Sequence, residues 1–291
     1  MVDSNEIAEQ LLEMATELAD TVDAARIVVP LDALPDDPAL DRRTIIVTRG
    51  AENAERAEKL ADTAEAATLD VPLVHLDRPG QVNLAMVLAL SQDLLKQDDF
   101  AVFVLGEQGE RADTIHVLRV NDDLGLLSMM EKVAKKKVIK RAVFQRVVTV
   151  ALALAGEGRE GRPVGAIFVI GDTDKVSDFT EQLIINPFRG YPENMRNILD
   201  DDLLETIKEF STIDGAWVVR GDGVIVSAGT LLRASLADED LPKGLGARHA
   251  AAAGITRATD ALAISVSQSD GAVRVWRNGR IVTEFERARR P

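Results

Sequence analysis

Two short motifs in the last third of the chain carry side chains of the kinds that act on phosphates. Asp214-Gly215-Ala216 opens an apolar run typical of a strand, and residues 244–250 lead into an alanine-rich helix. The Asp214 carboxylate suits a divalent cation or a proton. Arg248 offers a planar fork for phosphate oxygens, and glycines before a helix expose backbone N–H groups to an anion. Together these groups indicate chemistry on a nucleotide phosphate.

Each motif alone has an ordinary structural explanation. Asp-Gly is a common turn, and an arginine in the first turn of a helix is often a surface ion pair. Neither motif is a phosphate-binding loop with Gly-Lys-Ser/Thr or a complete dinucleotide fingerprint. His249 can ligate a metal or donate to a phosphate. A strand-like run ends in polar side chains that suit either a pocket wall or an exposed edge: Ser265, Ser267, Gln268 and Ser269.

Composition restricts the class of protein. The 291 residues suit one large domain or two ordinary ones, and 46% hydrophobic residues suffice for a packed core. The absence of cysteine excludes thiolate catalysis, disulfides and cysteine-bound zinc. A net charge of −14 argues against general affinity for nucleic acids. No apolar run reaches the roughly 18–20 residues of a membrane span, and no secretory signal opens the chain. We therefore expect a cytoplasmic protein with no nucleic-acid or membrane partner.

Residues 1–124 predict an N-terminal α/β domain. Asp3 and Glu6 resemble a helix cap, and Ile7, Leu11, Met14 and Leu18 follow at helical spacing. Helices are expected around 52–66 and 82–96. Strands are expected at 27–29, 44–47, 71–75, 100–105 and 115–120. This alternation predicts a mostly parallel sheet covered by helices. The half faintly resembles the C-terminal α/β domain of pyruvate kinase, which implies a regulatory or assembly role.

Residues 125–291 predict a second domain with a mixed sheet. A long helix is expected over 126–155, with a basic first half and an apolar second half. Strands are expected at 164–170 and 261–267, and helices near 200–210 and 247–258. Two strand pairs flank Gly221-Asp222-Gly223 and residues 277–280, which are hairpin signals. The motif residues thus fall at the ends of predicted strands and at the start of a helix.

Taken together, the C-terminal residues resemble the diadenylate cyclase domain family, and with the preceding α/β domain its archaeal, DacZ-like branch. The family patterns are Asp-Gly-Ala and Gly-Thr-Arg-His-Arg. They correspond here to Asp214-Gly215-Ala216 and to Gly246-Ala247-Arg248-His249-Ala250. The run beginning at Asp260 is similar to the family's Asp-Ala-Leu strand and its Val-Ser-Glu/Gln ending. The resemblance covers about residues 125–291.

The resemblance implies a nucleotidyltransferase that condenses two ATP molecules into cyclic di-AMP and two pyrophosphates. It implies a dimer whose two domains meet face to face, and Mn²⁺ or Mg²⁺ as cofactor. Catalytic roles are implied for Asp214, Arg248 and His249, with metal binding by Asp214 and His249. Contacts to ATP are implied for Gly215, Ala216, Leu231, Leu232, Gly246, Ala247, Ser267 and Gln268. The two leucines are equally compatible with a place near adenine and a place in the core.

Three departures keep a second interpretation open. Ala247 stands where the family pattern has Thr, Ala250 where it has the second Arg, and Ser269 where an acidic residue is frequent. Fewer phosphate contacts are compatible with a non-catalytic sensor of ATP or cyclic di-AMP on the same fold. A third interpretation places the main activity in residues 1–124, where no sharp catalytic motif occurs. Retention of Asp214, Arg248 and His249 favours the cyclase.

Overall fold

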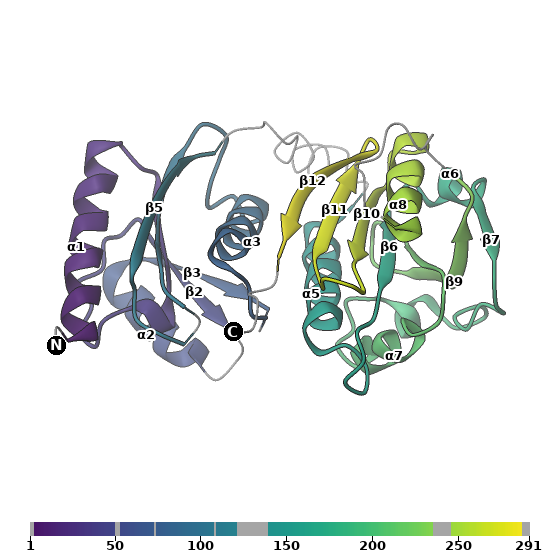
Figure 1. Cartoon of the computed structure of the whole chain (residues 1–291), viewed down its shortest axis with the longest axis horizontal. Coiled ribbons are helices and arrows are strands. Elements are labelled where there is room, and N and C mark those ends of the chain that lie inside the picture. The colour runs from purple at the N-terminus through teal and green to yellow at the C-terminus, as the bar shows by residue number, and fades with distance from the viewer. Residues whose placement is uncertain are drawn as a thin grey trace. The chain divides into compact units, whose positions relative to one another are not determined.

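The computed structural model describes residues 3–49, 53–72, 74–107, 109–120, 139–234 and 246–286. Within these ranges the chain forms two compact units, residues 3–120 and residues 139–286 (Figure 1). The predicted boundary near residue 125 lies outside the described residues. So does the first part of the helix predicted over 126–155. Its described part, α5, spans Arg141–Glu157.

The first unit is an α/β fold around a five-stranded sheet of order β3-β2-β1-β4-β5. The first four strands in this order run parallel, and β5 lies antiparallel along β4. The predicted mostly parallel sheet is therefore confirmed. Helices α1 and α2 share one apolar core with β1, β2 and β4, whereas α3 covers the other face of the sheet (Figure 1). The elements are α1 (Ser4–Thr21), β1 (Arg26–Pro30), η1 (Leu31–Ala33), β2 (Thr44–Arg49), α2 (Ala54–Ala64), β3 (Ala67–Val71), α3 (Arg78–Ser91), β4 (Phe100–Leu105) and β5 (Thr114–Arg119).

Two predictions in this unit were wrong in detail. Helix α1 begins after Asp3, which caps it by accepting from the backbone N–H of Asn5, but its buried face is shifted by one residue from the predicted one. Ile7 and Met14 are exposed, whereas four neighbouring side chains are buried, three of them alanines whose small size lets α1 approach the sheet. Those residues are Ala8, Leu12, Ala15 and Ala19. The strand predicted at 71–75 lies earlier, as β3.

The second unit is built on a seven-stranded mixed sheet of order β12-β11-β10-β6-β8-β9-β7. Helices α5 and α8 both contact β10, β6 and β11 and therefore cover opposite faces of the sheet. The helices predicted near 200–210 and over 247–258 and both hairpins are confirmed, and α5 confirms the described part of the helix predicted over 126–155; β7 and α6 were not predicted. The elements after α5 are β6 (Ala166–Ile170), α6 (Thr173–Ser177), β7 (Thr180–Gln182), η3 (Glu193–Arg196), α7 (Leu203–Phe210), β8 (Ala216–Val219), β9 (Ile225–Leu232), α8 (Ala247–Ala258), β10 (Leu262–Val266), β11 (Val273–Arg277) and β12 (Arg280–Phe285).

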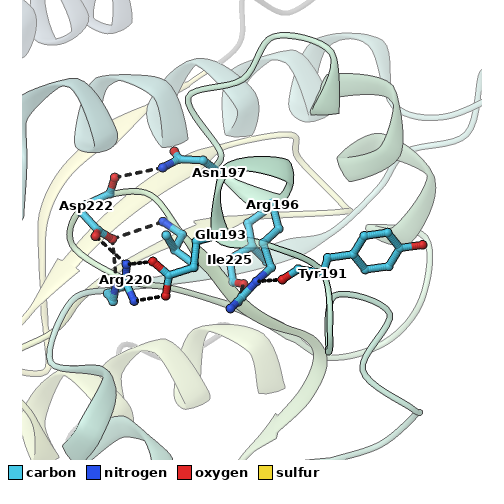
Figure 2. A network of polar contacts seen from close by, with 8 residues as sticks. Tyr191, Glu193, Arg196, Asn197, Arg220, Asp222 and Ile225 are labelled. Atoms are coloured by element: carbon cyan, nitrogen blue, oxygen red, sulfur yellow. Dashed lines mark hydrogen bonds and ion pairs between the residues drawn. The ribbon is translucent and has the colours of Figure 1, made fainter.

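A cluster of polar contacts, which we call the polar clamp, fixes the segment around η3 on the turn between β8 and β9 (Figure 2). Arg220 donates to both carboxylate oxygens of Glu193 at 2.7 Å and to Asp222 at 2.8 and 2.7 Å. The Arg220 hydrogen bonds lower the pKa of both carboxyl groups. Asn197 donates to the Asp222 carbonyl at 3.3 Å. The clamp thus supports the hairpin whose first strand follows the Asp214 motif.

Candidate active site

The register of four strands determines where the motifs meet. Strands β6 and β8 run parallel, and β10 runs antiparallel to β6, with Val266 opposite Ala166. Strand β9 runs antiparallel to β8, with Thr230 opposite Ala216. The beginnings of β6 and β8 therefore share one edge of the sheet with the ends of β9 and β10. The first turn of α8 joins them, so that one pocket receives residues from all five elements.

The Asp214 motif enters the sheet through a close backbone approach. Gly215 has φ +118°, a conformation that residues with a side chain rarely adopt. A Cβ at Gly215 would lie 2.5 Å from both the Gly229 carbonyl carbon and the Thr230 nitrogen. The β8–β9 pairing is irregular at this point, between Ala216 and Val218. The glycine thus allows the strand to begin directly behind the exposed Asp214 side chain.

We expect Gly215→Ala to lower the free energy of unfolding by about 2–5 kcal/mol, because backbone strain adds to overpacking against Gly229. Urea denaturation followed by circular dichroism measures this change. Gly246→Ala is the matched control, since a Cβ at Gly246 meets nothing within 4 Å. We expect the control to stay within about 1 kcal/mol of wild type. Equal midpoints for the two variants would show that the approach is not tight.

Arg248 links three parts of the pocket. Its Nη2 donates to Asp214 Oδ1 at 3.1 Å, and its Nη1 donates to Gln268 Oε1 at 3.3 Å. Gly165 leaves room for the guanidinium, because a Cβ there would lie 2.6 Å from Arg248 Nη1. The Asp214 side chain is 88% exposed and that of Arg248 is 37% exposed. Both charged groups are therefore at the mouth of the pocket, where a ligand can reach them.

The start of α8 lies at the cavity. Gly246 is the N-cap residue, and no side chain among the described residues caps the helix there. The first backbone N–H groups of a helix have no partner within it and carry partial positive charge. Ala247, which replaces the family's Thr, and Gly246 are exposed at this end. A phosphate is the kind of ligand that such an end accepts.

His249 lies deeper and contacts a second arginine. Its side chain is buried, and its Nε2 lies 3.0 Å from Nη1 of Arg274 on β11. An arginine only donates, so Nε2 accepts, and a neutral ring then carries its proton on Nδ1. Burial, followed by the positive charge of Arg274, lowers the pKa of His249 and favours this neutral ring. The arrangement disfavours metal ligation by His249 and leaves its phosphate role open.

The carboxylates of Asp270 and Glu284 both contact the Arg274 guanidinium. Its Nη2 donates to Asp270 Oδ2 at 3.2 Å and pairs with Glu284 Oε1 at 2.5 Å. Burial raises the pKa of the Asp270 carboxyl, but hydrogen bonds from Ser267, the Ala272 backbone and Arg274 together bring that pKa below its ordinary value. Burial raises the pKa of Glu284. Asp270 is therefore the firmly ionised partner of Arg274.

All eleven site residues predicted from the sequence line one cavity of about 530 Å³. The size falls within the range of roughly 300–1,000 Å³ for small-molecule sites. The lining combines polar residues with apolar ones, and the apolar ones include Leu231, Leu232, Leu183 and Ile167. Sequence reasoning missed Thr230, Asp270 and Arg274, which also line the cavity. The signal for Arg274 was available, since it is a charged residue inside the apolar strand β11.

The donor set fits a divalent cation that arrives with a phosphate ligand. Among the described residues no three His, Asp or Glu side chains lie close enough together to hold a metal. Mg²⁺ is commonly held by one or two carboxylates together with substrate phosphates. The Asp214 carboxylate is 88% exposed and satisfies that requirement, although one of its oxygens accepts from Arg248. In the described part of the chain, no helix has the length and apolar character to cross a bilayer.

A family model and individual proteins match the sequence of this chain. A family model described as "DisA bacterial checkpoint controller nucleotide-binding" matches residues 153–281. A diadenylate cyclase from Methanocaldococcus jannaschii is 40% identical over 207 residues, which cover 70% of this chain and 66% of that protein. One from Haloferax volcanii is 36% identical over 201 residues, covering 68% and 72%. The chain thus spans about two thirds of the length of these relatives.

Two solved structures show weaker likeness. DacA from Staphylococcus aureus is 24% identical, with a TM-score of 0.34, over 51% of this chain and 86% of that chain. A pyruvate kinase from Cryptosporidium parvum is 22% identical, with a TM-score of 0.30, over 39% and 22%. Both TM-scores are too low for a conclusion about the fold of this chain. The archaeal relatives, in contrast, confirm the resemblance predicted from the Asp214 and Arg248 motifs, and the chain belongs to the diadenylate cyclase family.

Proposed function

We propose that this chain makes cyclic di-AMP from two ATP molecules in the 530 Å³ cavity, with two copies of the chain facing each other. The observation that carries the proposal is the Asp214–Arg248 pair at the mouth of a pocket that the N-terminus of α8 also lines. The polar wall suits the phosphates of ATP. The apolar lining residues Leu231, Leu232 and Leu183 suit its adenine.

The reaction is a pair of reciprocal nucleotidyl transfers. The 3′-oxygen of each ATP bonds to the α-phosphorus of the other ATP. The bond from that phosphorus to the bridging oxygen breaks, and pyrophosphate leaves. The two 3′-protons pass to bases, for which the Asp214 carboxylates are placed at the mouth of each pocket. Catalysis then consists of positioning and of charge stabilisation at the phosphates.

The residue roles follow from their surroundings. Arg248 stabilises charge on the phosphates, and the first turn of α8, beginning at Gly246, holds them through backbone N–H groups. Ser267 and Gln268 complete the phosphate wall from the end of β10, and Gln268 also braces the Arg248 guanidinium. Gly215 and Ala216 are small lining residues, and they leave room for the nucleotide to lie beside Asp214.

A divalent cation would be held by Asp214 together with the phosphates of ATP. When bound, Mn²⁺ or Mg²⁺ neutralises phosphate charge and eases loss of the 3′-proton. A cation that arrives with its substrate fits a pocket in which the described residues include no cluster of three metal-binding side chains.

A second copy is required because one pocket of this size holds one ATP. Each ATP is attacked by the 3′-oxygen of the other, so that both pockets must open toward the same junction. The high exposure of Asp214 supports this arrangement, because its carboxylate reaches outward from its own copy.

The first experiment incubates the purified protein with ATP and either Mn²⁺ or Mg²⁺ and identifies the products by mass spectrometry. We expect cyclic di-AMP and pyrophosphate in a 1:2 ratio, and loss of both products when EDTA removes the cation, because the phosphate charge is then no longer neutralised. A non-hydrolysable ATP analogue, titrated in parallel, reports binding separately from turnover.

The non-catalytic sensor is the competing function, and Ala247 and Ala250 are the residues that favour it. It predicts ATP or cyclic di-AMP binding with no product under any cation or salt condition. That result would overturn the cyclase while leaving the nucleotide site intact.

A further inference from the structure

We propose that Arg274 is a positioning residue of this site, joining the first turn of α8 to the loop after β10 and holding His249 with its proton on Nδ1. Arg274 is 8% exposed and lines the cavity, yet it does not belong to either sequence motif. Its assignment as a support for bound ATP rests on the proposed function. Its link to His249 rests on the geometry of the chain alone.

The Arg274 guanidinium connects the two segments that we assign to phosphate binding, which we call the two walls. One wall is the start of α8, where His249 follows Arg248 directly. The other is the loop after β10, where Ser267 Oγ lies 3.2 Å from Ser269 Oγ and Asp270 closes the turn. Arg274 donates to His249 on the first wall and to Asp270 on the second. A planar fork with several fixed donors is suited to such a bridge, and a lysine ammonium is not equivalent.

Glu284 fixes Arg274 from the neighbouring strand. Arg274 lies opposite Glu284 in the β11–β12 pair, and their side chains are 2.5 Å apart. Two carboxylates therefore orient a single guanidinium toward His249. Arg274 and Glu284 both lie on paired strands of the sheet rather than on a loop. Strands hold their side chains more precisely than loops do, so the guanidinium is placed precisely between His249 and Asp270.

The contact with Arg274 requires the less common neutral tautomer of His249, with its proton on Nδ1. The Nδ1 of His249 is buried, and no described group of the protein lies within hydrogen-bonding distance of it. Placing the proton there leaves a buried donor unpaired, which is costly. The ordinary tautomer, with the proton on Nε2, would instead bring two donors together at the Arg274 contact. The unpaired Nδ1–H is thus the expected signature of the bridge.

Nitrogen-15 NMR of the three histidines tests the bridge without nucleotide. We expect the proton of His249 on Nδ1, and the exposed His75 and His116 with their proton mainly on Nε2. In Arg274→Met we expect His249 to revert to the Nε2–H form, whereas the exposed Arg280→Gln on β12 leaves it unchanged. A proton on Nε2 of His249 in the wild-type protein would overturn the proposal, even if the variant failed to fold.

Binding of a non-hydrolysable ATP analogue with Mg²⁺ tests the positioning role. We expect Arg274→Met to weaken binding roughly ten- to a hundredfold, the range for losing well-placed hydrogen bonds to a charged ligand. Arg280→Gln should bind like the wild type. Unchanged binding by a folded Arg274→Met with a reverted tautomer would refute the positioning role. A wild-type protein that binds no nucleotide would instead refute the proposed function, while the tautomer result stands.

Discussion

Asp214→Asn is expected to lower the rate of cyclic di-AMP formation by about 10²–10⁴-fold, the range for removing a group that transfers a proton and holds a cation. Asparagine keeps the size of the side chain and an oxygen that accepts from Arg248 Nη2. It loses the negative charge, so that it neither takes the 3′-proton nor binds the cation. Mass-spectrometric product assays at saturating ATP measure the effect.

The fold should survive this substitution. The Asp214 side chain is 88% exposed, and the close packing at this point belongs to Gly215. Asp178→Asn, at an exposed position of the same unit after α6, is the charge-matched control and should retain full activity. Full activity in Asp214→Asn would remove this carboxylate from the mechanism. Equal losses of ATP binding and turnover would assign it to binding alone.

Helix α8 and the β11–β12 hairpin of the second unit were predictable because local signals there agree with the tertiary structure. Helix α8 occupies the predicted residues, with Gly246 before it and alanines throughout. The turn between β11 and β12 uses Asn278 and Gly279 with φ +50° and +78°, the conformation that favours this residue pair. Each signal lies within a few residues of the structure that it indicates, and the packing of the second unit agrees with it.

The errors occur where packing decides. Helix α1 carries larger apolar side chains at Ile7 and Met14, and a hydrophobicity pattern assigns them to the core. The sheet instead receives the alanine face, whose small side chains let the helix pack closely. Strand β7 consists of Thr180–Gln182 and forms only by pairing with β9. Its sequence carries no strand pattern of its own.

The same distinction applies to the site. Asp214, Arg248 and His249 belong to short motifs, and a motif can be identified from the sequence. Arg274 and Asp270 become site residues only because β11 pairs with β10 and places a guanidinium under α8. A charged residue in an apolar strand indicates burial with a partner, but it does not say which partner. The partner becomes known only from the three-dimensional arrangement.

Dimers that contain two different inactive copies should make a linear product. We expect co-assembly of Asp214→Asn with Arg248→Met, purified through two different tags, to yield the linear triphosphate dinucleotide but no cyclic di-AMP. If Asp214 of one copy serves the ATP held by Arg248 of the other, one composite site stays intact and the second is doubly damaged. One 3′-oxygen then bonds to one α-phosphorus, and ring closure does not follow.

The two homodimers are the controls, and neither should give either product, because each has both composite sites damaged. Asp214 and Arg248 lie 3.1 Å apart within one copy, which supports the alternative that both residues serve the same ATP. If both residues serve the same ATP, each copy in the mixed dimer has one damaged site, and no linear product forms. The linear dinucleotide therefore separates catalysis across the dimer from catalysis within one copy, which the loss of activity in either single variant does not.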